Sequence, residues 1–193
     1  MKTKKVYSYL IAACSCMTMV SLTSCDEKIT DDFDFDEKYV EYIEFKEPCL
    51  INHATPTEVH AWMKANMPEW ELSLPWIGVK DDDKHLSYHY GTYILGRTIA
   101  YYFDEEGLCD IYMDGNFHMK DVLMVLDEKY GKKTPENILA TPGYKCEYYK
   151  YFEPKGDLEF VYIMRSYGKS MDNEYTDHTT ILYYFRNTPE YYK

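Results

Sequence analysis

The sequence lacks the short motifs that mark many hydrolases, nucleotide-binding proteins and zinc enzymes. Its 193 residues contain no GxSxG nucleophile motif, no glycine-rich phosphate-binding loop, no HExxH pair and no CxxC. His85 and His89 fall in a predicted strand, where four residues span about 13 Å, which is too far for two ligands of one metal ion. We therefore expect no metal, no cofactor and no catalytic residues, in a protein that is not an enzyme.

Positive charge is also scarce. Lys and Arg number 21 against 33 Asp and Glu, which gives a net charge of −12 at pH 7. Three of these lysines and no acid lie before residue 25, so a chain that begins there has a net charge of −15. Such a charge repels phosphate backbones, and we exclude nucleic acid as a partner.

The first 24 residues have the features of a secretory signal peptide. Lys2, Lys4 and Lys5 form a basic start, and a mainly apolar stretch follows over residues 6–22. This stretch is short for a membrane-spanning helix, which needs roughly 20 apolar residues. Residues 1–24 are therefore predicted to be removed after export.

The end of this segment, Leu22-Thr23-Ser24-Cys25, resembles the lipobox of bacterial lipoproteins. The resemblance implies cleavage between Ser24 and Cys25 and attachment of a diacylglycerol to the Cys25 thiol. Residues 11–14 fit the same pattern, but cleavage before Cys14 leaves an apolar region of about five residues, below the roughly seven that such a signal needs. The alternative is an ordinary secretory signal in which the cysteine has no role.

An acidic tether is predicted over residues 25–38, because this stretch is rich in Asp and has no helical period. An acidic stretch directly after the lipidated cysteine resembles the surface-export signal of lipoproteins from Bacteroides-like bacteria. In enteric bacteria, by contrast, Asp at that place is associated with the inner membrane. We expect a lipid-anchored protein of the cell envelope, in the outer membrane, with surface exposure as a further option.

Three cysteines remain after processing and lipidation: Cys49, Cys109 and Cys146. An envelope compartment permits one disulfide among them. Three thiols are too few for a disulfide framework, and no spacing indicates a redox or zinc site. Buried thiols that behave as small hydrophobic side chains are the interpretation that we favour.

Two helices are predicted from capping residues and apolar periodicity. Thr55-Pro56-Thr57-Glu58 forms a capping box with Pro at the first helical position, and Pro68 ends this helix. The second helix carries apolar residues at positions 119, 122, 123, 126 and 130, and Gly131 ends it. Strands are predicted over residues 39–45, 86–95, 97–103, 108–113, 144–152, 158–164 and 179–185.

The order of one helix and three strands therefore occurs twice. The phrases Ile99-Ala100-Tyr101-Tyr102-Phe103 and Ile181-Leu182-Tyr183-Tyr184-Phe185 strengthen the impression of a repeat. We predict an α+β domain over residues 39–193, with module one at about 39–115 and module two at about 116–193. The two tandem α-β-β-β modules would form one antiparallel sheet of about six strands with the helices on one face.

These modules resemble two known families. The residues that carry the resemblance are Thr55, Glu58, Val59, Tyr101, Phe103, Asp104, Gly107 and Leu108. A helix that opens with Thr-x-x-Glu-Val, followed by strands with a Tyr-x-Phe-Asp-x-x-Gly-Leu hairpin, looks like the small-lipoprotein module of the outer-membrane assembly accessory subunit. Two such modules in tandem resemble the β-lactamase inhibitory protein, and uncharacterised Tyr-rich lipoproteins of Bacteroides-type bacteria are similar overall. The resemblance implies binding of another protein without catalysis.

Tyrosine is unusually abundant, with 22 residues. Tyr offers a rigid apolar body and a polar tip, which suit both exposed sheet faces and recognition surfaces. The candidate binding residues cluster after the first helix: Trp70, Trp76, Tyr88, Tyr90 and Tyr93. They form either the rim of the core or a contact surface. We expect a non-catalytic protein-interaction module with an envelope protein as partner, and the alternative is a surface carbohydrate-binding lipoprotein.

Overall fold

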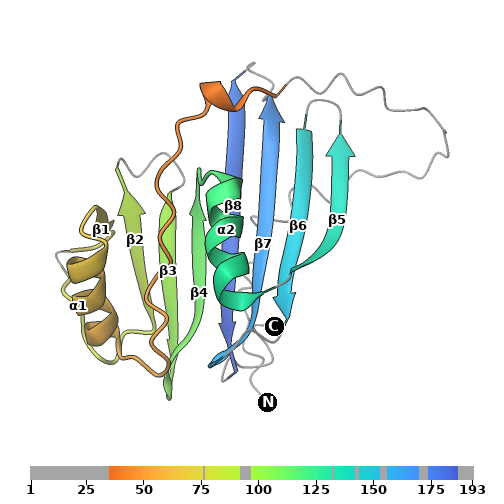
Figure 1. Ribbon diagram of the computed structural model, residues 1–193. Helices are drawn as coiled ribbons and strands as arrows, with labels where there is room; N and C mark the ends of the chain where they lie inside the picture. Colours follow the sequence, from red (N-terminus) through yellow and green to blue (C-terminus); the bar gives the residue numbers. More distant parts are fainter. Residues whose placement is uncertain are drawn as a thin grey trace, which may run out of the picture. The chain divides into compact units, whose positions relative to one another are not determined.

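The computed structural model describes residues 35–75, 77–91, 97–131, 133–141, 144–152, 156–169 and 174–186. This part of the chain is an α+β domain built on one antiparallel sheet of eight strands (Figure 1). The predicted signal peptide and the predicted lipidation site, Ser24 and Cys25, lie outside the described residues. Within the described part, no helix has the length and apolar character needed to cross a bilayer.

The elements alternate between single helices and four-strand meanders. After a short 3-10 helix η3 (Glu37–Tyr39), the first group is α1 (Pro56–Asn66), β1 (Trp70–Leu72), β2 (His85–Tyr90), β3 (Thr98–Asp104) and β4 (Gly107–Gly115). The second group is α2 (Met119–Tyr130), β5 (Thr134–Thr141), β6 (Tyr144–Phe152), β7 (Leu158–Lys169) and β8 (Tyr175–Phe185). Each helix is thus followed by four strands, and the sheet has eight strands where about six were predicted.

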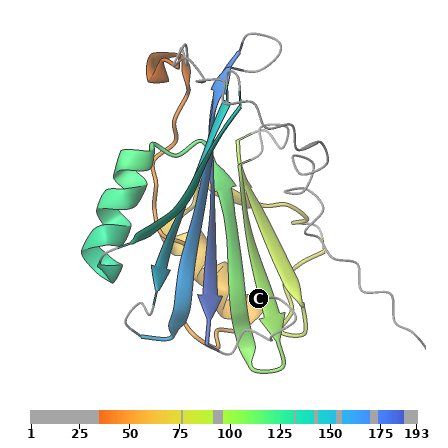
Figure 2. The same ribbon diagram turned by 90° about the vertical axis from the view of Figure 1, so that its right-hand side faces the viewer.

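The strand order is β1-β2-β3-β4-β8-β7-β6-β5. The two groups therefore meet where β4 pairs with β8, and each meander runs from an outer edge of the sheet inward to that seam. Viewed along its edge, the sheet is strongly twisted, as expected for L-amino acids (Figure 2).

The observed strands differ from the predicted ones in three places. β1, which has only three residues, and β5, which begins at Thr134-Pro135, were not predicted. Residues 39–45 form no strand beyond an isolated parallel bridge between Ile43 and Phe117. This segment is extended, as its aromatic and β-branched residues suggest, but it crosses the sheet instead of joining it (Figure 1).

Both predicted helices are confirmed. The capping box of α1 is complete, because the Glu58 carboxylate accepts from the Thr55 amide at 2.8 Å and the Thr55 hydroxyl accepts from the Glu58 amide at 3.3 Å. α2 begins at Met119 and ends before Gly131, as its apolar spacing predicts. Val59 and Met63 of α1 and Val122 and Leu126 of α2 are buried.

The core lies on one face of the sheet, in rows of residues that face each other across the strands. One row runs through Leu86, Tyr101, Ile111, Tyr183, Val161 and Tyr151, all of which are buried. The Tyr101 hydroxyl donates to the Met63 sulfur of α1 at 3.0 Å, and the Tyr151 hydroxyl donates to Asp127 of α2 at 2.7 Å. The phenols thus join the core to the helices through their polar ends.

The cysteines behave as the favoured interpretation expects. Cys49 and Cys109 are buried, Cys146 is half-buried, and no disulfide joins any of the three. Burial raises the pKa of the Cys109 thiol to about 12, with the charges of Asp110 and Asp104 acting in the same direction. The thiol is therefore protonated near neutral pH.

Candidate functional site

The predicted aromatic cluster comes together only in part. Trp70 and Tyr90 face each other across β1 and β2 with ring centroids 5.5 Å apart, and Tyr88 points under α1, where its hydroxyl lies 2.8 Å from the His60 Nδ1. Trp70 and Tyr88 are only 4% and 1% exposed, so these two belong to the core, the first of the two alternatives. Tyr90 is half-buried against the core, whereas Trp76 and Tyr93 lie outside the described residues.

A pocket of about 570 Å³ lies beside α1 and includes two of these aromatics. It is lined by His60, Lys64, Pro68, Trp70, Glu71, Leu72, Pro75, Gly78, Val79 and Tyr88. Burial and the charge of Lys64 lower the pKa of His60. Among the described lining residues, Glu71 is the only acid, whereas a glycoside hydrolase uses two facing carboxylates.

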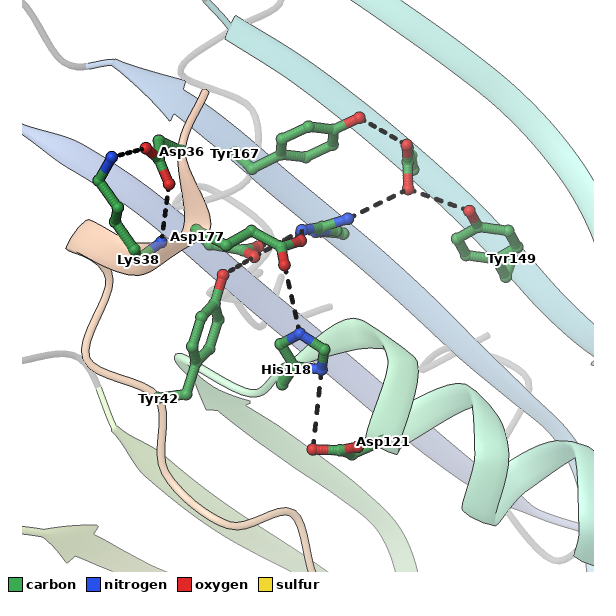
Figure 3. Close-up of polar contacts among 11 residues, drawn as sticks. Asp36, Lys38, Tyr42, His118, Asp121, Tyr149, Tyr167 and Asp177 are labelled. Atoms are coloured by element: carbon green, nitrogen blue, oxygen red, sulfur yellow. Dashed lines mark hydrogen bonds and ion pairs between the residues drawn. The ribbon is translucent and has the colours of Figure 1, made fainter. Parts of the chain in front are cut away.

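A buried ion-pair cluster lies where β6, β7 and β8 meet the segment of residues 36–42, and it is shown in Figure 3. The Asp177 carboxylate is fully buried and accepts from Arg165 at 2.8 and 2.6 Å and from the Tyr42 hydroxyl at 2.7 Å. Glu147 accepts from the hydroxyls of Tyr167 at 2.6 Å and of Tyr149 at 3.0 Å.

The groups of this cluster are engaged with one another. Burial opposes the charge of Arg165, but the hydrogen bonds and charge of Asp177 outweigh it and raise the pKa of the guanidinium. Burial and Glu147 raise the pKa of Tyr149 to about 12. His118 lies 3.3 Å from Glu37 and 3.7 Å from Asp121. The acids of the cluster have donors among the described residues, and these contacts hold residues 37–42 against the sheet.

The face of the sheet opposite the core carries a second set of aromatics, which we call the tyrosine face. Successive residues of a strand point to opposite sides, so Tyr102 and Tyr184 face away from the buried Tyr101 and Tyr183. The tyrosine face is defined by the half-buried residues Tyr102, Tyr112, Tyr148, Tyr162, Tyr184 and Phe160.

Rings on the tyrosine face contact one another across the strands. Phe160 and Tyr184 lie 4.5 Å apart between ring centroids, and the Lys150 ammonium lies 4.0 Å from the centroid of Phe160. Tyr148 and Tyr162 lie 6.2 Å apart. Aromatic rings on this face therefore pack in pairs across β6, β7 and β8.

Two acids of β4 lie on the tyrosine face, four residues apart. The Asp114 carboxylate is 2.7 Å from the His178 Nε2 and accepts from the Thr180 hydroxyl at 2.7 Å. Asp110 makes no hydrogen bond or ion pair with any of the described residues. Burial alone raises the pKa of Asp110 to about 7.

The sequence interpretation missed the tyrosine face, although the signal for it was present. The two Ile-x-Tyr-Tyr-Phe phrases lie in β3 and β8, which are not equivalent strands of the two groups, so they are not evidence of a repeat. Instead β3 and β8 both pair with β4, one on each side. In each phrase the first tyrosine faces the core and the second faces outward.

Comparisons with models of protein families, with curated proteins and with solved structures find no match. In the described part of the chain, no three His, Cys, Asp or Glu side chains come together as a metal site would require.

Proposed function

We propose that this chain is an envelope lipoprotein that binds another protein through its tyrosine face, without catalysis. The observation that carries the proposal is the set of five tyrosines and Phe160, all half-buried, on the face of the sheet opposite the core. Tyrosine is enriched at protein interfaces because it buries a large rigid ring and still places a hydroxyl for hydrogen bonding.

Carbohydrate binding is the alternative that the same aromatics could serve. A sugar ring stacks on an open aromatic face, whereas the face of Phe160 is approached by the Lys150 ammonium and its ring packs against Tyr184. Rings that already pack on one another favour a broad, flat contact, which suits a protein surface better than a single sugar.

The proposal includes the finer architecture. We infer two tandem modules, each with one helix and four strands, and both helices on the core face. The symmetric strand order supports this, as do the hydrogen bonds from Tyr101 to α1 and from Tyr151 to α2, because the two tyrosines belong to one buried row. In such an arrangement the tyrosine face lies on the side of the sheet opposite the helices.

Photo-crosslinking in the producing cells tests the binding proposal. A photoreactive amino acid in place of Tyr162 should capture one discrete protein, and the same amino acid in place of Met124, which is 61% exposed on α2, should not. Equal capture at both positions would refute the tyrosine face as the interface. Capture of polysaccharide alone from position 162 would favour the carbohydrate alternative.

The anchor has its own test. Cys25→Ser should move the protein from the membrane fraction to the soluble fraction, because two or three acyl chains are needed for stable anchoring. Cys14→Ser is the matched control and should leave the protein with the membranes. A Cys25→Ser protein that still sediments with membranes would contradict lipidation, and mass spectrometry of the amino terminus gives an independent result.

A further inference from the structure

Asp110 lies in the middle of an aromatic row on the tyrosine face. The register pairs Asp110 with Tyr102 of β3 on one side and with Tyr184 of β8 on the other. The row continues outward to His85, whose ring is 5.0 Å from that of Tyr102, and to Phe160, whose ring is 4.5 Å from that of Tyr184. Side chains directly opposite across antiparallel strands have their β-carbons roughly 5 Å apart, so both phenol rings flank the carboxylate.

Among the described residues, no cation balances this carboxylate. Asp114 lies on the same face of β4, four residues further along the strand. Its carboxylate is 2.7 Å from both His178 and Thr180. Asp110 has neither a hydrogen-bond donor nor an ion-pair partner among the described residues, although it is half-buried. Its charge instead acts on Tyr184, whose pKa is raised by burial and then by Asp110.

An unmatched, half-buried carboxylate opposes folding when it is ionised, because burial removes water from the charged form. The face around it supplies what an incoming cation needs. Aromatic rings attract an ammonium or guanidinium group placed over them, and a carboxylate between two rings adds a charged hydrogen-bond acceptor. A positive group supplied by a partner would therefore complete this site.

We propose that Asp110, flanked by Tyr102 and Tyr184, is the receptor for a basic side chain, lysine or arginine, of the partner that binds the tyrosine face. This inference rests on the proposed function and names the chemistry of its central contact. A basic anchor also suits the strongly acidic chain, since a net charge of −12 attracts positively charged surfaces.

Small probes test the site without the partner. The full chain, labelled with ¹³C at the aspartate carboxyl carbons, is titrated with Nα-acetyl-lysine methylamide and with Nα-acetyl-arginine methylamide. Nα-acetyl-norleucine methylamide, which lacks the charge, is the control. The Asp110 resonance should shift saturably with at least one basic probe, and its titration midpoint should move to lower pH, because a bound cation favours the ionised form.

Two variants give the matched comparison. Asp110→Asn should weaken binding of the basic probe at least about tenfold, as expected for the loss of one charge-assisted hydrogen bond. Asp82→Asn removes the same charge from an exposed loop and should leave the affinity unchanged. An equal loss in both variants, or an equal shift of Asp110 with the norleucine probe, would overturn the proposal.

The outcome separates this inference from the proposed function. If the crosslinker at position 162 captures the same protein from wild type and from Asp110→Asn with equal yield, the partner binds but the basic anchor is wrong. If the basic probes bind at Asp110 and position 162 captures no protein, the cation site stands and the protein-binding proposal fails.

Discussion

On one face of the sheet Tyr101 and Tyr183 flank Ile111 and are fully buried, whereas on the other face their neighbours Tyr102 and Tyr184 flank Asp110 and remain half-buried. The residue between the two tyrosines on β4 is the aliphatic Ile111 on the first face and the acidic Asp110 on the second. Tyrosine therefore fills the core on one face of the sheet and forms a surface on the other.

The polar groups of the two faces differ in the same way. On the core face Asp177 has three donated hydrogen bonds, from Arg165 and Tyr42. On the tyrosine face Asp110 has none within the described part of the chain. A buried charge with its partners in place becomes costly only when one partner is removed, whereas an unsatisfied charge is a cost that a binding partner can remove.

Truncation of one tyrosine on each face should give the largest contrast. Tyr183→Ala should lower the free energy of unfolding by about 3 to 5 kcal/mol, because it leaves a cavity in the core. Tyr184→Ala should lower it by less than about 1 kcal/mol. Urea denaturation measures both.

Tyr183→Phe sharpens the same test, since the buried Tyr183 hydroxyl has no hydrogen-bond partner among the described residues. Its removal should leave stability unchanged or raise it. A Tyr184→Ala protein as unstable as Tyr183→Ala would show that the two faces are not different.

Asp177→Asn should have the next largest effect. The substitution leaves Arg165 buried without its main counter-charge, and we expect a loss of about 3 kcal/mol in the free energy of unfolding. Glu71→Gln, whose side chain is 79% exposed, is the control and should change stability by less than about 0.5 kcal/mol. Calorimetry of the three proteins in one buffer gives the comparison.

Asp110→Asn should stabilise the protein, in contrast to Asp177→Asn. An Asp in the unfolded chain ionises near pH 4, whereas the pKa of Asp110 in the folded protein is about 7. The folded state therefore holds an extra proton between these values, and stability falls as pH rises through that range.

The variant should equal wild type at pH 4 and exceed it by about 2 kcal/mol at pH 8, a figure reduced for the partial exposure of the side chain. Thermal unfolding at the two pH values measures the difference. A variant that gains nothing at pH 8 would show that Asp110 is matched in solution.

His178→Gln should give the smallest effect, and its effect should be seen at low pH instead of high pH. Burial opposes the charge of His178, but the hydrogen bond and charge of Asp114, with the charge of Asp177, outweigh it and raise its pKa. The stabilisation is complete below the ordinary value of about 6.5 and is lost as pH rises through the raised pKa. We expect a loss of about 0.5 to 1 kcal/mol at pH 5 and almost none at pH 9.

Much of the local structure could be predicted from the sequence, because it depends on neighbours in the chain. The capping box at Thr55 and Glu58 and the stop at Gly131 are of this kind. The turn before β4 is another, since Gly107 has a φ of +109° and a β-carbon there would lie 2.5 Å from the His53 carbonyl oxygen.

The site could not be predicted in the same way, because it depends on which strands become neighbours. Nothing in residues 97–103 indicates that β3 and β8 will both pair with β4, and this pairing alone places Tyr102 and Tyr184 beside Asp110. The residues chosen from the sequence, Trp70 and Tyr88, were aromatic and near a loop, but packing against α1 buries them. Alternation along each strand predicts which side of the sheet a tyrosine faces. Only the strand order gives the residues beside it on the neighbouring strands.

The two outermost strands limit how the sheet can pair with another chain. β1 offers only three residues of unpaired backbone, and the pairing of β5 with β6 is interrupted by a bulge between Pro135 and Asn137. Short or irregular border strands are poor templates for a further chain, and proline has no amide hydrogen to donate. Both edges of this wide sheet thus disfavour edge-to-edge pairing with the backbone of a second copy.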